Sequence, residues 1–337
     1  MRRILTAAVV ATVALSAGCS SSSGTSGSGG GQVTLRLGFL ANITHAPALI
    51  GVEQGIFQKA LGKNVTLKVS IYSTGTEEAT ALLANQLDAA YVGPNPAINT
   101  WQKSSGKAIR IISGVATGGA SVVVKKGITS AAQLKGKSMA TPSLGNTQDV
   151  ALRYWLKQQG LTTTSTGGGD VSIKPVTPNS ASVLEFKSGQ IDGGSEPSPY
   201  NVEMLQDGGT TLLTEPGVTT NLVATQAFIA AHPTVISGLL EGQIKADAYI
   251  AQNPTGAETA ANAELTKLEG KGIKSSVLPA AFKEITFTDN PDAASLATDA
   301  KEAIAVGLLS PVNLNGIYDL GPLNQLLKAA GEPQVSS

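Results

Sequence analysis

Polar groups that follow short apolar strands are the residues of this sequence best placed to bind a ligand. The apolar run Ala89–Val92 predicts a buried strand that turns sharply at Gly93-Pro94. Asn95 followed by Pro96 is typical of an N-cap and first residue of a helix, here Ala97–Lys103. Backbone N–H groups and an amide would then lie beyond the carboxyl end of a strand, where α/β sheets bind ligands and helix N-termini favour anions. An ordinary strand-to-helix turn would have the same sequence, so this stretch indicates only a candidate site.

The same order of strand, polar turn and helix recurs along the chain. Val33–Phe39 and Val65–Tyr72 alternate apolar and polar residues and predict strands. Ala108–Val115 predicts another strand, and Thr74 with Glu77 is a capping-box signature for the helix after the second strand. This alternation predicts an α/β fold with mostly parallel sheets flanked by helices. Because parallel strands end at one edge of a sheet, we expect the polar turns to converge there. These turns contain Thr44, Ser73, Thr74, Asn95 and Thr117.

Catalytic, metal and cofactor motifs are missing from the sequence. It has no phosphate-binding glycine loop with lysine, no paired-histidine zinc motif and no nucleophile elbow in the globular part. The chain has two histidines, and neither has the spacing of a metal ligand. His232 precedes a proline at a helix start and suits a structural role, whereas His45 either lines a cleft or is structural. We therefore predict no enzymatic activity, no metal and no cofactor.

Charge limits the kinds of ligand that this chain can bind. The formal net charge is zero and charged residues make up 14% of the chain, so nucleic acid is not an expected partner. The arginines beyond the N-terminal segment are Arg36, Arg110 and Arg153, none in the convergent turns, and Arg153 is four residues from Asp149, which predicts a surface ion pair. An anion would therefore be held by backbone N–H groups, hydroxyls and amides. Glu196, if it faced the cleft, would favour an ammonium group.

The N-terminal segment has the features of a secretion leader. Arg2-Arg3 is followed by the apolar run Ile4–Leu15, which is too short to span a bilayer. Leu15–Cys19 resembles a bacterial lipobox, with Ser16 where leucine is usual, and predicts a lipoprotein signal peptide over 1–18 and lipidation of Cys19. Plain secretion with Cys19 unmodified is the alternative. Residues 19–32, rich in serine and glycine, would tether the folded part to the outer face of the cell membrane, or leave it periplasmic.

A short internal sequence repeat predicts two similar lobes. Ala84–Ala90 and Ser188–Gly194 share glutamine, an aliphatic residue, aspartate and small residues, and each is followed by Pro-x-Pro. We expect one lobe over 33–118 and 221–337 and a second over 119–220. The chain would cross between them near Thr117–Gly119 and Glu215–Thr220, where glycines permit large backbone rotations.

Three separated stretches carry a resemblance to a known family. Leu35–Ile50, Asp88–Asn99 and Leu144–Leu152 are similar to the extracytoplasmic solute-binding proteins of ABC importers, in particular the aliphatic sulfonate, taurine and nitrate type, and Gly316–Leu320 is similar too. The resemblance implies a two-lobed, periplasmic-binding-protein-like fold (type II) with a ligand cleft between the lobes. It also implies a monomer that delivers its solute to a membrane permease driven by an ATPase.

The resemblance also implies which loops contact the ligand. The loop Ser195–Tyr200 departs from the family pattern, because relatives tend to have an aromatic residue and Pro-Glu-Pro-Trp there. The predicted ligand is aliphatic sulfonate-like, with taurine, nitrate or a thiamine precursor as alternatives. An enzyme on the same fold or a ligand sensor domain are the alternative functions. By position, the contacting residues are Asn42, Thr44, His45, Ser73, Thr74, Gly75, Pro94, Asn95, Thr117, Gly118, Asn146, Thr147, Gln148 and Glu196.

Overall fold

Two β-sheets organise the computed structural model, which describes residues 32–337. The predicted leader and Cys19 lie outside the described residues. One sheet has six strands in the order β11-β4-β10-β3-β1-β2, and the other has five in the order β7-β6-β8-β5-β9. The first contains β1 (Val33–Leu40), β2 (Val65–Tyr72), β3 (Ala89–Val92), β4 (Ile109–Gly118), β10 (Val218–Thr225) and β11 (Ile285–Phe287). The second contains β5 (Ala120–Val124), β6 (Ser138–Thr141), β7 (Ser172–Pro175), β8 (Gly193–Pro197) and β9 (Thr210–Glu215).

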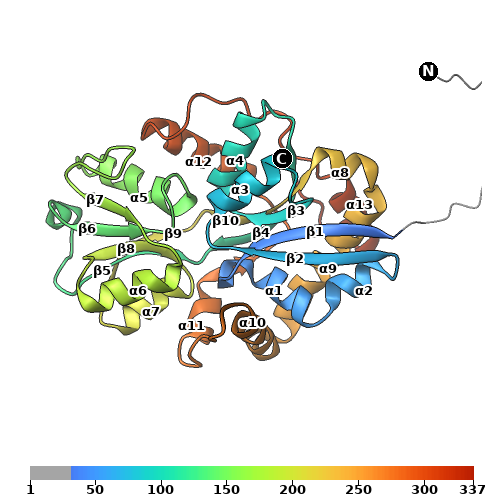
Figure 1. Ribbon diagram of the computed structural model, residues 1–337, viewed down its shortest axis with the longest axis horizontal. Helices are drawn as coiled ribbons and strands as arrows, with labels where there is room; N and C mark the ends of the chain where they lie inside the picture. The colour runs from blue at the N-terminus through green and yellow to red at the C-terminus, as the bar shows by residue number, and fades with distance from the viewer. Residues whose placement is uncertain (1–31) are drawn as a thin grey trace, which may run out of the picture. The chain divides into compact units, whose positions relative to one another are not determined.

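Helices lie on both faces of each sheet (Figure 1). We call the six-stranded sheet with its helices the first lobe and the five-stranded sheet with its helices the second lobe. The described residues contain no helix that is both long enough and apolar enough to cross a membrane. The second lobe has α5 (Thr147–Gln158), α6 (Asn179–Ser188), α7 (Tyr200–Gln206) and the 3₁₀ turn Ala131–Leu134. The first lobe has the 3₁₀ turn Ile43–His45, α1 (Ala46–Glu53), α2 (Ile56–Leu61), α3 (Gly75–Leu83), α4 (Pro94–Lys103), α8 (Gln226–Ala231), α9 (Pro233–Gln252), α10 (Pro254–Glu269), α11 (Leu278–Lys283), α12 (Ala293–Ala305) and α13 (Gly321–Ala330).

Each sheet separates two apolar cores. In the first lobe, Leu37 and Phe39 of β1 pack with α1, α9 and α10 on one face, whereas Val92 packs with α4 and α12 on the other. In the second lobe, Val122 packs with α5 on one face, and Val123 packs with α6 and α7 on the other. Alternation along each strand therefore fills a core on both sides. The predicted two-lobed α/β fold is confirmed.

The sheets are mixed, so the expectation of mostly parallel sheets was wrong in that detail. β1 pairs parallel with β2 and β3, but β10 runs antiparallel to both β3 and β4. Likewise β6 pairs parallel with β7 and β8, whereas β5 is antiparallel to β8 and β9. Every antiparallel pair, including β11 with β4, contains at least one of the strands β4, β5, β9 and β10, which carry the chain directly from one sheet to the other. Because no helical crossover intervenes there, these strands lack the long connection that parallel neighbours require.

The internal sequence repeat corresponds to an equivalent contact in each lobe. The Asp88 carboxylate accepts hydrogen bonds from the backbone N–H and side chain of Arg36, at 2.8 and 2.9 Å. The Asp192 carboxylate accepts the N–H of Ser138 at 2.9 Å and forms an ion pair with Lys137. Each aspartate immediately precedes a strand, β3 or β8, and accepts a backbone N–H of the parallel neighbour of that strand, β1 or β6. The repeated sequence therefore encodes the same local geometry twice.

The chain passes between the two sheets at β4–β5 and at β9–β10. Gly118 and Gly119 connect the first pair with φ of 70° and 73°, a conformation that glycine adopts without strain. A Cβ at Gly118 would also lie 2.7 Å from the carbonyl oxygen of Glu284. Pro216-Gly217 connects the second pair, and the N–H of Gly118 donates to the carbonyl of Gly217 at 2.9 Å. The two crossings are therefore hydrogen-bonded to each other.

Candidate functional site

A small cavity of about 30 Å³ lies between the lobes, and we call it the central cavity. It is enclosed by loops that follow β1, β3, β6 and β7 and by the N-termini of α3 and α5. This is the edge of the sheets at which the polar turns were expected to meet. Its lining residues are Leu40, Asn42, Thr44, His45, Gly75, Gly93, Pro96, Pro142, Asn146, Thr147, Gln148, Asn179, Pro197 and Thr219.

The first-lobe wall of the cavity contains His45 as a neutral hydrogen-bond donor. Burial lowers the pKa of His45 to about 3, so the imidazole is uncharged at neutral pH. Its Nδ1 accepts the N–H of Leu40 at 3.2 Å, which leaves the proton on Nε2. Asn42 Oδ1 accepts the N–H and hydroxyl of Thr44 at 3.0 and 2.7 Å, so its amide group remains a donor. None of the residues lining the central cavity is acidic, lysine or arginine.

The second-lobe wall is the N-terminus of α5. Asn146 is the N-cap, and its Oδ1 accepts the N–H of Asp149 at 2.9 Å. Its Nδ2 donates to Gln148 Oε1 at 3.1 Å. The Thr147 hydroxyl has no hydrogen-bond partner although the residue is 6% exposed. It faces Gly93 of the first lobe, where an added Cβ would lie 2.6 Å from the hydroxyl oxygen. The α5 N-terminus is therefore pressed against the opposite lobe.

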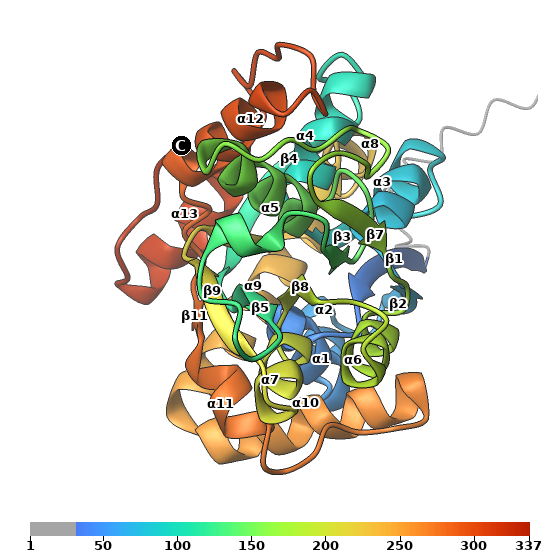
Figure 2. The same cartoon turned by 90° about the vertical axis from the view of Figure 1, so that its left-hand side faces the viewer.

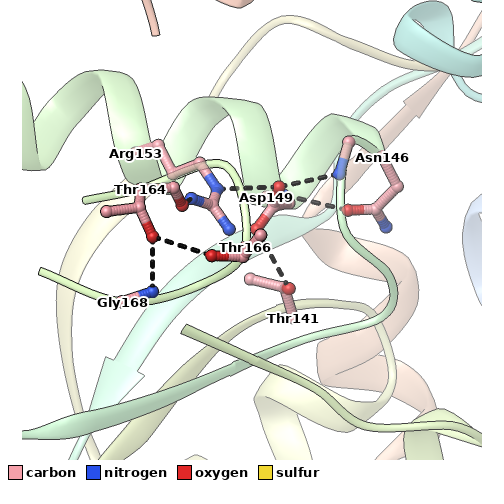
Figure 3. Close-up of polar contacts among 8 residues, drawn as sticks. Thr141, Asn146, Asp149, Arg153, Thr164, Thr166 and Gly168 are labelled. Carbon is pink, nitrogen blue, oxygen red and sulfur yellow. Dashed lines mark hydrogen bonds and ion pairs between the residues drawn. The ribbon is translucent and has the colours of Figure 1, made fainter. Parts of the chain in front are cut away.

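A buried ion pair fixes this wall, so the prediction of a surface pair between Asp149 and Arg153 was wrong. The two side chains are 0% and 1% exposed, and Arg153 Nε donates to Asp149 Oδ2 at 2.8 Å (Figure 3). The carboxylate also accepts the N–H of Gly145 at 2.7 Å and the hydroxyl of Thr141. Arg153 donates in addition to the carbonyl of Thr164. The four-residue spacing places both side chains on the face of α5 that is turned into the lobe, where the carboxylate holds the Asn146 loop.

The N-terminus of α3 contributes to the site and links the lobes. Thr74 is the N-cap and accepts the N–H of Glu77 at 3.2 Å, while the Glu77 carboxylate accepts the N–H of Ser73 at 3.0 Å. Gly75 then lines the cavity. The hydroxyl of Thr76 donates to that of Ser143, in the second lobe, at 3.2 Å.

Asn95 has a different place from the one expected. Helix α4 begins at Pro94 with Gly93 as its N-cap, so Asn95 is not the N-cap. Proline suits the first helical position, which moves the start of the helix forward. The Asn95 amide donates to the carbonyl of Asp299 at 3.3 Å, and its Oδ1 has no partner. The prolines at positions 94 and 96 also remove two of the N–H groups that this helix end could have offered.

The other expected ligand residues divide into those that line the cavity and those that do not. Ser73 lines an adjoining pocket of about 190 Å³ with Asn42 and Asn179. Thr117 and Gly118 pair with β11, outside the lining. Glu196 is fully buried in the second lobe with both carboxyl oxygens unpartnered, and burial raises its pKa well above the usual value. The expected residues that line the central cavity are Asn42, Thr44, His45, Gly75, Asn146, Thr147 and Gln148.

Sequence reasoning missed Asn179 and Thr219, which both line the cavity. Asn179 begins α6 shortly after β7, so the strand-to-helix rule could have found it. Thr219 lies on the crossing strand β10 and follows no such pattern. Its hydroxyl donates to the carbonyl of Gly118 at 2.8 Å, a contact that depends on the tertiary arrangement of the two crossings.

Comparison with known proteins identifies the family. Residues 28–265 match the model of the NMT1-like family. A protein of Brucella abortus, provisionally named as a binding protein, is 29% identical over 163 residues, which are 48% of this chain and 47% of that protein. The chain thus spans about half the length of the curated relatives it matches.

Solved structures share the fold. The alkanesulfonate-binding protein of Xanthomonas axonopodis, bound to MOPS, aligns with a TM-score of 0.70 and 16% identity over 86% of this chain and 99% of that one. The periplasmic nitrate-binding protein of Synechocystis aligns with a TM-score of 0.71 and 17% identity over 89% and 90%. At these identities the likeness shows the fold alone. The predicted relationship to solute-binding proteins is confirmed at the level of family and fold, and the chain belongs to the NMT1-like family.

Proposed function

We propose that this chain is the extracytoplasmic receptor of an ABC importer and binds a small polar or anionic solute. The observation that carries the proposal is the central cavity, which lies between the lobes and is lined by uncharged donors at the N-termini of α3 and α5. Family membership and the fold of the sulfonate- and nitrate-binding proteins support it.

The chemistry of the lining favours an anion with several oxygen acceptors. Neutral His45, Asn42, Asn146 and the first residues of α5 line the cavity and offer hydrogen-bond donors, and no carboxylate is among the lining residues. Hydrogen bonds to a charged partner contribute roughly 1.5–3 kcal/mol each. About four of them would supply the roughly 8 kcal/mol that a micromolar receptor requires. An aliphatic sulfonate suits this site best, and taurine, nitrate or a thiamine precursor would use the same donors.

Ligand entry requires the lobes to separate. The cavity volume of about 30 Å³ is close to the share of one water molecule in liquid. Hydrogen bonds close the lobes around it, from Thr76 to Ser143 at 3.2 Å, from the Tyr200 hydroxyl to the Ala41 carbonyl at 2.9 Å and from the Ile43 N–H to the Ser198 carbonyl at 3.0 Å. The loop Ser195–Tyr200, which departs from the family pattern, thus supplies two of these bonds. A bound solute would shift an open ensemble toward a closed form that the permease recognises.

Titration calorimetry with methanesulfonate, taurine, nitrate and a thiamine precursor tests the ligand class. The matched variant is Asn146→Asp, which keeps the N-cap acceptor for the Asp149 N–H but replaces the Nδ2 donor with negative charge. We expect one of these solutes to bind the wild type and to bind the variant at least about a hundredfold more weakly. If the folded wild type bound none of the four solutes, or if the variant bound the solute as tightly as the wild type does, the proposal would be rejected.

Attachment to the membrane through Cys19 is part of the same proposal. Cys19 follows the lipobox-like segment and is the single cysteine of the chain. Metabolic labelling with a tagged fatty acid should mark the wild type and not Cys19→Ala. Labelling of both, or of neither in a lipoprotein-competent host, would contradict the anchor.

A further inference from the structure

A second and larger pocket lies beside the central cavity, where β9 leads into β10. We call it the crossing pocket. Its volume is about 370 Å³, and its lining includes residues of α5 in the second lobe and of α12 in the first. These two helices lie side by side (Figure 2). Thr147 and Thr219 line both the crossing pocket and the central cavity, so these two residues form the wall between them. The central cavity, whose lining is uncharged, thus adjoins the crossing pocket, whose lining differs.

One wall of the crossing pocket is aromatic. Ala151, Tyr154, Trp155 and Gln158 of α5 all line it, and their spacing of three and four residues places them on one helix face. Tyr154 and Trp155 are half-buried, so both rings retain exposed surface toward the pocket. Aromatic faces attract cations positioned within about 6 Å of the ring centre.

The opposite wall is acidic. Asp299 and Glu302 of α12 line the pocket, as does Glu215 at the end of β9, which is 9% exposed. No lysine or arginine is among the lining residues. The cations on α5 are engaged elsewhere, since Arg153 pairs with Asp149 and Lys157 donates to the carbonyl of Ala305.

One carboxyl oxygen of the crossing pocket lacks a partner. Asp299 Oδ2 is buried without a hydrogen bond, in a residue that lines the pocket. Burial raises the pKa of Glu215 to about 8, although the Ser195 hydroxyl donates to its carboxylate, and burial raises that of Asp299 well above its usual value. Neither carboxyl group has a cationic partner here, so a cation between them would stabilise their charged forms.

The geometry favours an organic cation over a metal ion. Among residues 32–337 no group of three or more histidine, cysteine, aspartate or glutamate side chains lies close enough to hold a metal. The carboxyl groups are spread around a volume that a small organic molecule would fill, with an aromatic surface opposite them.

We propose that the crossing pocket is a second binding site, which takes a small organic ammonium ion. The ammonium group would lie between Glu215 and Asp299, and the carbon body would pack against Tyr154 and Trp155. The site includes residues of both lobes and does not depend on the identity of the solute in the central cavity.

Calorimetry at pH 8.5 with 2-phenylethylammonium tests this site, and 2-phenylethanol is the matched neutral probe. We expect the ammonium ion to bind at least about tenfold more tightly than the alcohol. The double variant Glu215→Gln/Asp299→Asn should lose about tenfold in affinity for the ammonium ion and leave that for the alcohol unchanged. Trp155→Leu, which keeps every carboxyl group, should weaken both probes.

The control variant is Glu241→Gln, which removes an exposed carboxylate paired with Lys245 on α9 and should leave binding unchanged. Equal affinity of the wild type for the two probes would overturn the proposal. So would the absence of ammonium binding, or full retention of it in the folded double variant. Failure of the sulfonate and nitrate panel would leave these outcomes unaffected, so the two proposals fail separately.

Discussion

Replacing Gly93 with alanine should act on the contact between the lobes rather than on either lobe alone. Gly93 has φ −65° and ψ 157°, which alanine adopts without strain. The added Cβ would lie 2.6 Å from the Thr147 hydroxyl, whereas the next nearest atoms, at 3.6 and 3.7 Å, are at ordinary contact distances. Thr147 belongs to the opposite lobe, so separating the lobes relieves the overlap.

The magnitude follows from that distance. The Cβ would be about 0.8 Å closer than the 3.4 Å at which ordinary contact begins. Overpacking of this kind costs roughly 1–3 kcal/mol. Because only the closed form pays this cost, ligand affinity should fall roughly fivefold to 150-fold while the melting temperature changes little.

The assay combines solute affinity by calorimetry with the radius of gyration by small-angle scattering. Gly321→Ala is the matched control, since its nearest atom would be at 3.8 Å. Thr147→Ala removes the clashing oxygen, so Gly93→Ala should have little further effect in that background. Unchanged affinity and size in Gly93→Ala, or the same loss with and without the Thr147 hydroxyl, would refute this account of closure.

Three further predictions concern the contact between the lobes, the Asp149–Arg153 ion pair on α5, and His45. The double variant Thr76→Cys/Ser143→Cys should form a disulfide between the lobes on mild oxidation, because the two hydroxyl oxygens are 3.2 Å apart. Non-reducing electrophoresis should detect the disulfide, and slower solute exchange should show that it holds the lobes closed. Cysteines that stay reduced after oxidation would contradict the closed arrangement. Asp149→Asn should cost roughly 3–5 kcal/mol in urea unfolding, because Arg153 remains buried without its counter-charge, and adding Arg153→Met should recover part of this loss if the pairing is the cause. The pKa of His45 is about 3 in the folded protein and about 6.5 in the unfolded chain, so the unfolded chain binds more protons between these two pH values. The free energy of unfolding should therefore fall as pH drops below 6.5, by about 2 kcal/mol at pH 5. Urea unfolding at pH 7 and pH 5 should show this loss in the wild type and not in His45→Gln, and an equal loss in both would exclude His45 as its source.

The parts of the site that follow parallel strands could be predicted from the sequence. Asn42, Thr44 and His45 follow β1, Gly75 follows β2 and Asn146 follows β6, and strand ends of this kind meet at one edge. The alternation of strand, turn and helix predicted Thr44, whereas the family resemblance implied the other four residues.

The remaining parts depend on tertiary packing that local patterns do not encode. Asn95 was misplaced because two prolines allow two starts for α4, and only the packed structure selects Pro94. The pairing of Asp149 with Arg153 was predicted from the spacing, but its burial follows from which face of α5 meets the sheet. The crossing pocket combines α5, α12 and a strand connection that are far apart in sequence.

Helix α5 serves both pockets at once. Its first residue lines the central cavity and its side lines the crossing pocket. Asp149 and Arg153 on its buried face hold it in the second lobe through hydrogen bonds with Gly145 and Thr164. A tilt of α5 would therefore change the central cavity and the crossing pocket together. Thermodynamic linkage then requires that a ligand in one pocket changes the affinity of the other pocket by the same factor in both directions.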